Sequence, residues 1–256
     1  MDRLKDKVAI ITGGGSGMGR SACVLFAKEG AKVVVAELDA KSGQETVEMI
    51  KKAGGKAVFI KTDVSIPSDC QRMVRTAVDT YGKLDILFNN AGILGWEGVP
   101  LADVTLEILN KVIDVNLKGV FYGMKYAIPE MVKAGGGSII NTSSAIVDRS
   151  MYNFGGYCAS KGGVLALSRQ AAADYIGQNI RVNSILPGFI KTPMLGIFLA
   201  ENPNVEEQLA SLHPKGRLGT PDEVAWLVLF LASDESSYIT GIEITIDGGF
   251  NRLARA

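Results

Sequence analysis

The sequence predicts an α/β protein, namely a doubly wound (Rossmann) parallel sheet of seven strands with helices on both faces. Short runs rich in β-branched residues alternate with segments of helical length and period along the whole chain. The strand segments are mostly continuous apolar runs, as expected when both faces of a sheet are covered. No Pro- or Ser-rich linker and no repeat divides the sequence, so we expect a single domain over residues 1–256.

The seven strands are expected where the apolar, β-branched runs lie: at residues 7–12, 32–37, 57–62, 84–89, 138–143, 181–186 and 243–246. Helical periodicity predicts the intervening helices at residues 18–29, 41–53, 68–81, 105–133, 157–176 and 221–232. Gly30 supplies the stop signal for the first helix. Strict alternation of strand and helix indicates parallel pairing of the strands.

Residues 188–217 are the least regular stretch, with Pro193, Pro203 and Pro214 around short helical pieces. This stretch follows the carboxyl end of a predicted strand, the edge at which doubly wound sheets bind ligands. We therefore expect a lid over the substrate, with a plain surface connection as the alternative.

Composition excludes several classes of protein. Lysine plus arginine equals aspartate plus glutamate at 27 each, which argues against a nucleic-acid partner. Residues 1–7 are charged and no apolar run reaches about 18 residues, so we expect a cytoplasmic protein without a membrane partner. The three cysteines are scattered and there is one histidine, so the sequence predicts no metal site. A Ser-His-Asp triad would have to use that one histidine, His213, which is expected to lie in a loop.

A glycine-rich turn at residues 12–19 lies between the first predicted strand and the first predicted helix. Glycines permit a tight turn, and the helix N-terminus favours a negatively charged pyrophosphate. A strict GxGxxG pattern fails at Arg20, and the spacing is instead set by Gly13, Gly17 and Gly19. Its position between strand and helix favours dinucleotide binding over a purely structural loop.

Glu37 closes the second predicted strand, 18 residues after Gly19. An acidic side chain there accepts hydrogen bonds from both ribose hydroxyls of NAD and repels the 2′-phosphate of NADP. No basic residue precedes Arg20 in the turn or directly follows Glu37, so NAD is the expected cofactor. A solvated glutamate at the strand end is the alternative.

Tyr157 and Lys161 are four residues apart, which places a phenol and an ammonium on one face of a helix. A free tyrosine has a pKa of about 10, and a nearby positive charge is expected to lower that pKa toward neutrality. By itself, a YxxxK pattern occurs often on ordinary helix surfaces.

Several motifs together resemble the short-chain dehydrogenase/reductase family over essentially the whole chain. They agree with the family in order and spacing: the turn at residues 12–19, Asp63-Val64, the Asn-Asn-Ala-Gly run at residues 89–92, Asn116, Ser143-Ser144, Tyr157 with Lys161, and Pro187-Gly188. The resemblance implies an NAD-dependent oxidoreductase that transfers a hydride between NAD(H) and a carbonyl or secondary alcohol carbon.

The resemblance also implies the catalytic roles. Tyr157 is the acid/base, Ser144 hydrogen-bonds the substrate oxygen in preference to Ser143, and Lys161 holds the nicotinamide ribose. Asn116 fixes a water that links Lys161 to solvent. The alternative is that Asn116 is only a polar residue that kinks a long helix. Adenine contacts are implied for Asp63 and Val64, and carboxamide contacts near Ile190 and Thr192. The full implied cofactor set is Gly13, Ser16, Gly17, Met18, Gly19, Glu37, Asp63, Val64, Asn90, Ala91, Gly92, Tyr157, Lys161, Pro187, Gly188, Ile190 and Thr192.

The expected substrate pocket is mostly apolar. Its residues are Ser144, Ile146, Trp96, Phe154, Met194 and Phe198, with Leu94, Met151, Tyr152 and Ile197 as further candidates. This set suits a hydrophobic or cyclic ketone or alcohol, although Trp96, Met194 and Phe198 could equally pack within the lid. Asp148 and Arg149 lie near in sequence and leave a cyclic diol or a sugar open as the substrate.

The family resemblance further implies a homotetramer, built from the long helices at residues 105–133 and 157–176 and from the last strand. Two other functions use similar features. A non-catalytic NAD-binding scaffold would keep the fold without turnover, and a sugar-nucleotide epimerase would use the same YxxxK pair but usually has a longer chain.

Overall fold

The computed structural model describes residues 2–95, 98–200 and 204–253, without the side chains of residues 197–200. All seven strands form one parallel sheet in the order β3-β2-β1-β4-β5-β6-β7. Their bounds are β1 Val8–Thr12, β2 Lys32–Glu37, β3 Lys56–Lys61, β4 Ile86–Asn89, β5 Gly137–Thr142, β6 Ile180–Pro187 and β7 Glu243–Ile246. The expected doubly wound sheet is therefore confirmed.

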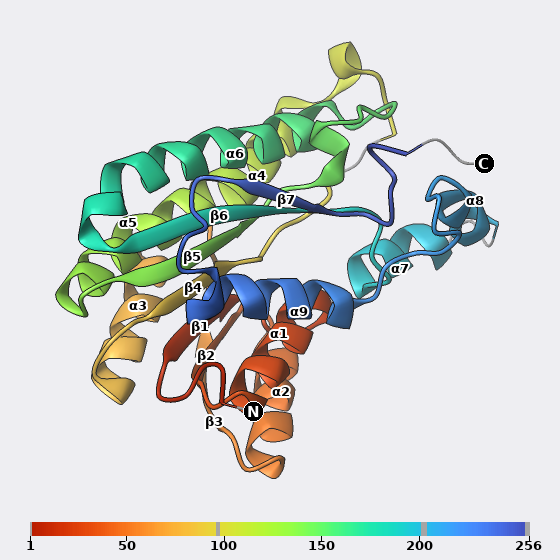
Figure 1. Ribbon diagram of the computed structural model, residues 1–256. Helices are drawn as coiled ribbons and strands as arrows, with labels where there is room; N and C mark the ends of the chain where they lie inside the picture. The colour runs from red at the N-terminus through yellow and green to blue at the C-terminus, as the bar shows by residue number, and fades with distance from the viewer. Residues whose placement is uncertain (1, 96–97, 201–203, 254–256) are drawn as a thin grey trace.

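Helices cover both faces of this sheet (Figure 1). On one face lie α1 (Gly17–Lys28), α2 (Ala40–Lys52) and α9 (Pro221–Ala232). On the other lie α3 (Pro67–Tyr81), α5 (Gly119–Lys133) and α6 (Gly155–Tyr175). Alternate strand residues supply the two cores: Ile11 and Phe88 face the α1/α9 layer, whereas Ile10 and Leu87 face the α3/α5/α6 layer. Burial on both faces explains why the strands are continuous apolar runs.

Short polar signals set the helix ends. Asp39 caps α2 by accepting hydrogen bonds from the backbone N–H groups of Lys41 and Ser42. Thr220 and Glu223 form a reciprocal capping box at the start of α9. Gly82 ends α3 in a left-handed conformation with φ 85°. The first two caps set where the chain enters α2 and α9, and Gly82 sets where it leaves α3 toward β4.

The single long helix expected at residues 105–133 is interrupted. The chain forms α4 (Leu106–Ile113), then a π-helical turn over Asp114–Lys118, and then α5. Asn116 lies inside this π turn and is fully buried. Such π turns occur frequently at functional sites, because the extra residue redirects side chains relative to an α-helix.

The stretch expected to be a lid contains two short helices, α7 (Pro193–Ala200) and α8 (Val205–Ser211). Figure 1 shows them at one end of the molecule, beyond α9. They have a small core of their own, made by Leu195, Leu209 and Leu218. A single bridge between Ile190 and Gly219 ties the two ends of the stretch together.

The strand order reverses at the centre of the sheet, since β1 pairs with β2 on one side and with β4 on the other. In open α/β sheets, ligands bind beyond the carboxyl ends of the strands at such a switch point. Among the described helices, none combines the length and apolar character needed to cross a membrane.

Candidate active site

The predicted site residues gather at the carboxyl edge of the sheet. The glycine turn follows β1, Glu37 ends β2, and Asp63 and Val64 follow β3. Asn90, Ala91 and Gly92 follow β4, Ser144 follows β5, and Pro187 ends β6 ahead of Gly188, Ile190 and Thr192. Tyr157 and Lys161 lie in the first two turns of α6. Parallel strands thus collect segments that are far apart in the sequence.

The glycine turn packs tightly against two neighbouring segments. Gly13 and Gly17 have φ values of 65° and 49°, which favour glycine. A Cβ atom on Gly13 would lie 3.0 Å from the Ala91 Cα, and one on Gly17 would lie 3.0 Å from the Thr192 Cγ2. The side-chain Nδ2 of Asn90 donates to the Thr12 carbonyl at 3.0 Å. The turn is therefore fixed against the segments after β4 and β6.

Glu37 lies directly beside this turn. Its Oε2 accepts a hydrogen bond from the Gly15 N–H at 2.9 Å, and its Oε1 accepts one from the Leu38 N–H at 2.8 Å. Arg20 is directed away along α2, where it donates to Thr46 Oγ1 at 3.0 Å and pairs with Glu45. The charged group that faces the glycine turn is thus the Glu37 carboxylate and not the Arg20 guanidinium.

Asp63 and Val64 make contacts within their own loop and core. Asp63 Oδ1 accepts hydrogen bonds from the Ser65 N–H at 2.9 Å and the Ser65 hydroxyl at 2.6 Å. Val64 is buried, and a Cβ on Gly119 would lie 2.9 Å from its Cγ2. These contacts hold the segment after β3 beside the start of α5.

Tyr157 is half-buried and hydrogen-bonded to the Ser144 side chain. Burial raises the pKa of Tyr157 to about 12, because the phenolate loses solvation, while the hydrogen bond with Ser144 acts in the opposite direction. Ser144 Oγ also accepts a hydrogen bond from the Ile146 N–H at 3.4 Å, which leaves its proton to donate. The two hydroxyls therefore act as one hydrogen-bonded pair.

Lys161 is buried, with 3% of its surface exposed. Its Nζ donates to the Thr142 carbonyl at 2.8 Å and lies 5.8 Å from the centre of the Tyr157 ring. Burial lowers the pKa of Lys161 to about 8. The expected lowering of the phenol pKa by this ammonium is not found here: burial dominates, and Ser144 supplies the opposing effect. Residue spacing shows that two groups share a helix face, but it does not show how deeply they are buried.

Asn116 is held by three hydrogen bonds of its side chain. Its Oδ1 accepts from the Ile93 N–H at 2.8 Å, and its Nδ2 donates to the Ile93 carbonyl at 2.9 Å and to Ser160 Oγ at 3.2 Å. A Cβ on Gly92 would lie 3.1 Å from Asn116 Oδ1 and 3.4 Å from Lys161 Nζ. Because Gly92 has no side chain, the segment after β4 can pack closely against the π turn and Lys161.

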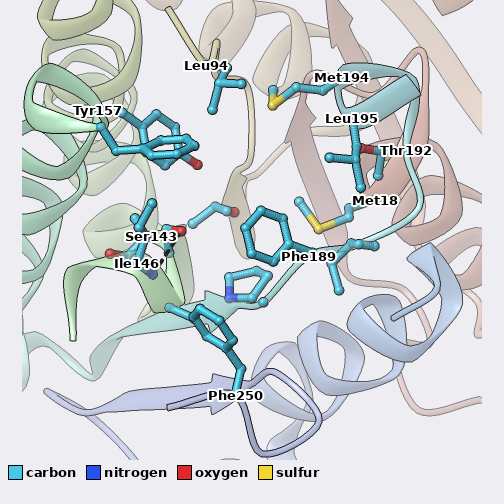
Figure 2. A pocket seen from close by; sticks show the side chains of 17 residues that line it. Met18, Leu94, Ser143, Ile146, Tyr157, Phe189, Thr192, Met194, Leu195 and Phe250 are labelled. Carbon is cyan, nitrogen blue, oxygen red and sulfur yellow. Dashed lines mark hydrogen bonds between the residues drawn. The ribbon is translucent and has the colours of Figure 1, made fainter. Parts of the chain in front are cut away.

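A cavity of about 840 Å³, counted with its mouth open to solvent, lies beside Tyr157 and Ser144. In the view of Figure 2, Tyr157 and Ser143 lie on one side of the cavity and Met18 and Thr192 on the other. The lining is Met18, Leu94, Thr142, Ser143, Ser144, Ala145, Ile146, Phe154, Tyr157, Pro187, Gly188, Phe189, Ile190, Thr192, Met194, Leu195 and Phe250. No charged side chain is among these described lining residues.

The expected pocket is found in part. Ile146, Phe154, Met194 and Leu94 line the cavity, but Tyr152 is 94% exposed and Met151 is not among the lining residues. Trp96 lies outside the described residues, as do the side chains of Ile197 and Phe198.

Arg149 does not add polarity to the pocket, because its guanidinium lies over the Phe250 ring, 4.6 Å from the ring centre. Sequence reasoning missed Phe189, Leu195 and Phe250. Phe189 and Phe250 come from a loop and a turn, whose side-chain directions have no periodicity to reveal them, and Leu195 lies in the short helix α7.

Two buried side-chain oxygens at this edge have no hydrogen-bond partner among the described residues, namely Asn90 Oδ1 and Thr142 Oγ1. Buried polar atoms are rarely left unpaired, so these atoms fit a polar ligand between the glycine turn and the cavity. The glycine turn, the open start of α1 without an acidic first turn, and Glu37 fit the pyrophosphate and ribose of a dinucleotide. Within the described part of the chain, no group of three or more potential metal ligands comes together.

Comparison with known families agrees with this geometry. The family model described as enoyl-(acyl carrier protein) reductase matches residues 13–251. The cyclohexanol dehydrogenase of Acinetobacter sp. (strain SE19) is 43% identical over 249 residues, which covers 97% of this chain and 96% of that protein. The chain belongs to the short-chain dehydrogenase/reductase family. The expected family resemblance is thereby confirmed.

Further members of this family are similarly close. The 2,5-dichloro-2,5-cyclohexadiene-1,4-diol dehydrogenase of Sphingobium indicum is 42% identical over 250 residues, 98% of each chain. The crystal structure of a 7α-hydroxysteroid dehydrogenase, solved with NADH and 7-oxo glycochenodeoxycholic acid, matches with a TM-score of 0.92 and 34% identity, covering 96% of this chain and 95% of that one. The protein is an oxidoreductase that uses a nicotinamide cofactor and acts on CH–OH and C=O groups.

Proposed function

We propose that this short-chain dehydrogenase/reductase interconverts an alicyclic secondary alcohol and its ketone with NAD(H) as the cofactor. One observation carries the proposal: the hydrogen-bonded hydroxyls of Tyr157 and Ser144 lie at the wall of a cavity lined mostly by apolar side chains. An apolar cavity with a few convergent polar groups suits a hydrophobic substrate that carries one reacting oxygen. The cyclohexanol dehydrogenase similarity supports a ring-shaped substrate.

NAD is favoured over NADP by the charge beside the glycine turn. The Glu37 carboxylate lies against the Gly15 N–H, whereas Arg20 is engaged by Thr46 and Glu45. A 2′-phosphate placed there would meet a negative charge without a free guanidinium. The similar steroid dehydrogenase was solved with NADH, which is consistent with this choice.

The remaining cofactor contacts follow from position at the same edge. We assign the pyrophosphate to the N-terminal turn of α1, with Ser16, Gly17, Met18 and Gly19. The segment after β4, which holds Asn90 to Gly92, and the segment after β6, which holds Ile190 and Thr192, border the nicotinamide half. Asp63 and Val64 border the adenine half. When bound, the nicotinamide supplies the hydride acceptor or donor.

Within this chain, Tyr157 and Ser144 handle the proton and the oxygen. In the oxidative direction, the Tyr157 phenolate removes the alcohol proton while the Ser144 hydroxyl donates a hydrogen bond to the substrate oxygen. Lys161, whose Nζ lies 5.8 Å from the centre of the Tyr157 ring, holds the nicotinamide ribose. Asn116 keeps the Ile93 segment and Ser160 fixed beside Lys161, where a water can carry the proton toward solvent.

The pKa of Tyr157 sets how the rate of each direction depends on pH. A phenol with a pKa of about 12 is protonated at neutral pH and can donate its proton to the oxygen of a ketone as that oxygen becomes an alkoxide. Oxidation requires the phenolate, whose fraction rises tenfold for each unit by which the pH increases toward that pKa. We therefore infer that Tyr157 is ready to act as the acid for reduction at neutral pH and that the oxidation rate rises under alkaline conditions.

Three wider features complete the proposal. Residues 188–217, with α7 and α8, act as a lid over the cavity, since Met194 and Leu195 line it from this segment. The enzyme assembles as a homotetramer through α5, α6 and β7 and acts in the cytoplasm. A cyclic diol is the second candidate substrate, which the similarity to the cyclohexadiene-diol dehydrogenase favours.

The test is a panel of cyclohexanol, a cyclohexanediol and a sugar, each assayed with NAD and with NADP at pH 7 and pH 10. We expect cyclohexanol with NAD to give the highest kcat/KM, about tenfold or more above NADP, which corresponds to about 1.4 kcal/mol. Tyr157→Phe should reduce kcat by about 10³-fold or more while the affinity for NADH, measured by fluorescence, stays within about twofold.

Ser150→Ala serves as the matched control, because it removes an exposed hydroxyl from the segment before α6 and should leave the rate unchanged. Substantial turnover by the Tyr157→Phe enzyme, or a higher kcat/KM for the sugar than for cyclohexanol, would contradict the proposed function. A higher kcat/KM for the cyclohexanediol than for cyclohexanol would make a cyclic diol, the second candidate, the proposed substrate.

A further inference from the structure

The segment after β7 forms one wall of the cavity. Phe250 is 2% exposed and lines the cavity together with Ser144 and Tyr157. Asp247 fixes the turn that carries Phe250: its Oδ1 accepts from the Gly249 N–H at 2.9 Å and its Oδ2 from the Asn251 N–H at 2.8 Å. The ring is therefore held in one place by the backbone on either side of it.

Phe250 belongs to a cluster of three rings from three segments. Its ring centre lies 5.8 Å from Phe189, after β6, in an edge-to-face arrangement, and 5.3 Å from His213, after α8. His213 is 1% exposed; its Nε2 accepts from the Phe189 N–H at 3.4 Å and its Nδ1 donates to the Leu209 carbonyl at 2.8 Å. The Phe250–Phe189 contact is edge-to-face and the Phe250–His213 contact is tilted by 30°, and both distances are within the range in which aromatic rings favour a fixed mutual orientation.

Arg149 connects this cluster to the catalytic segment. It comes five residues after Ser144, and its guanidinium carbon lies 4.6 Å from the Phe250 ring centre. Its Nη1 also donates a hydrogen bond to the Phe250 carbonyl. Among the described residues, no carboxylate forms an ion pair with Arg149. The contacts that hold its guanidinium are those with the ring and the backbone carbonyl of Phe250. A cation over an aromatic face is attracted by the ring quadrupole.

We propose that Arg149 and Phe250 form a latch that fixes one wall of the cavity shared with the Tyr157 and Ser144 hydroxyls and so determines which rings the cavity accepts. This inference rests on the proposed alcohol dehydrogenase function and deepens it. Arg149 is a positioning residue that acts through Phe250, and Phe250 is a residue that determines specificity. Neither belongs to the glycine turn, the catalytic set or the lid.

A fixed aromatic wall favours a compact, rigid substrate. A saturated six-membered ring has few rotatable bonds, so little conformational entropy is lost when it is placed between the wall and the hydroxyls. The wall offers apolar surface, because the Arg149 guanidinium is turned onto the ring and lies outside the described lining. A larger ring can bind only if the Phe250 side chain moves out of the cavity. The latch therefore selects small alicyclic alcohols and ketones over larger ones.

The test compares Arg149→Ala and Phe250→Ala with the wild type and with Arg75→Ala. Arg75 is a matched control, since it is an exposed arginine on α3 that pairs with Asp79 and lies outside the cavity. Kinetics are measured on cyclohexanol and on cyclododecanol with NAD, NADH affinity is measured by fluorescence, and hydrogen exchange is followed by mass spectrometry on the peptide covering residues 247–253.

For Arg149→Ala, we expect KM for cyclohexanol to rise about tenfold, kcat to stay within about twofold and NADH affinity to be unchanged. Exchange in residues 247–253 should accelerate, because the turn loses its tie to the segment after Ser144. Phe250→Ala should raise KM for cyclohexanol and lower it for cyclododecanol. The double variant should match Phe250→Ala, since Arg149 acts through that ring.

The latch is overturned if Arg149→Ala matches Arg75→Ala in both KM and exchange. It is also overturned if KM rises with no change in exchange, because Arg149 would then contact the substrate directly. If the wild-type enzyme does not oxidise cyclohexanol, the proposed function fails, yet the exchange of residues 247–253 in Arg149→Ala still decides whether the latch exists.

Discussion

At the scale of single residues, Tyr157 and Lys161 titrate in opposite senses on one face of α6. Burial lowers the pKa of Lys161 to about 8 and raises that of Tyr157 to about 12. Between pH 8 and about 10, the folded chain binds fewer protons at Lys161 than the unfolded chain, so stability rises with pH. Between pH 10 and 12, the folded chain keeps the Tyr157 proton longer than the unfolded chain, so stability falls.

This linkage predicts the behaviour of Lys161→Met, which replaces the buried ammonium with an apolar side chain of similar length. The wild type should gain free energy of unfolding relative to this variant as pH rises from 7.5 to 9.5, by on the order of 2 kcal/mol. Urea denaturation of the cofactor-free protein at the two pH values measures the difference.

Lys133→Met is the control, because Lys133 is 69% exposed and pairs with Glu130 on the surface. It should track the wild type at both pH values. If the Lys161→Met and wild-type curves stay parallel across this range, Lys161 is protonated throughout and its pKa is not lowered in the folded chain.

Most individual site residues are predictable from the sequence because their chemistry depends on residue type at a fixed spacing. Tyr157, Lys161, Ser144 and the glycine turn are of this kind, and they come together at one edge of the sheet. The direction of a loop side chain is different. Arg149 was expected to add polarity to the pocket, yet it turns onto Phe250, a ring about 100 residues further along that no local pattern brings near it.

At the scale of elements, helix periodicity predicts the presence of a helix better than its internal register. The apolar pattern at residues 105–133 continues through Asn116, so one helix was expected there. The π turn over Asp114–Lys118 places Asn116 where its amide pairs with both backbone groups of Ile93. Ile93 lies 23 residues earlier, and that long-range pairing is absent from any local pattern.

Helices α7 and α8 of the proposed lid have a separate small core, which predicts a separable effect on stability. Leu209 packs in the cluster of α7 and α8 with Leu195 and Leu218, whereas Leu229 packs in the large core under α9. Leu229→Ala should lower Tm by roughly 6–12 °C, since such a change costs about 3 kcal/mol in a domain of this size. Leu209→Ala should loosen the lid locally.

For Leu209→Ala we therefore expect a Tm shift below about 3 °C together with a KM for cyclohexanol raised about fivefold. Differential scanning calorimetry and steady-state kinetics on the two variants measure both quantities. Equal Tm losses for the two variants would mean that residues 188–217 unfold with the main core, and the lid assignment would then be wrong.

At the scale of the whole molecule, the parallel sheet explains why one edge carries the whole site. Every strand ends at the same edge, so the residues after β1, β4, β5 and β6 converge there although they span more than half of the sequence. Alternation of strands and helices predicts this convergence. Strand β7 is the end strand of the sheet, at the opposite end of the strand order from β3.

Apolar side chains remain exposed around β7 and α9. Trp226 on α9 is 48% exposed, Tyr238 is fully exposed and Ile242 is 42% exposed just before β7. Grouped apolar side chains at the surface mark interfaces more often than isolated ones do. In the proposed homotetramer, we expect this surface to form one of the two kinds of subunit contact, and α5 and α6 the other.

Trp226→Glu should therefore divide the tetramer into dimers, because a carboxylate buried against an apolar partner surface loses its solvation. Sedimentation velocity at micromolar concentration measures the species directly. Met49→Glu is the matched control, since Met49 is 47% exposed on α2, away from this surface, and the variant should remain tetrameric. A Trp226→Glu protein that sediments as the wild type does would remove this surface from the interface, and a monomeric wild type would remove the tetramer itself.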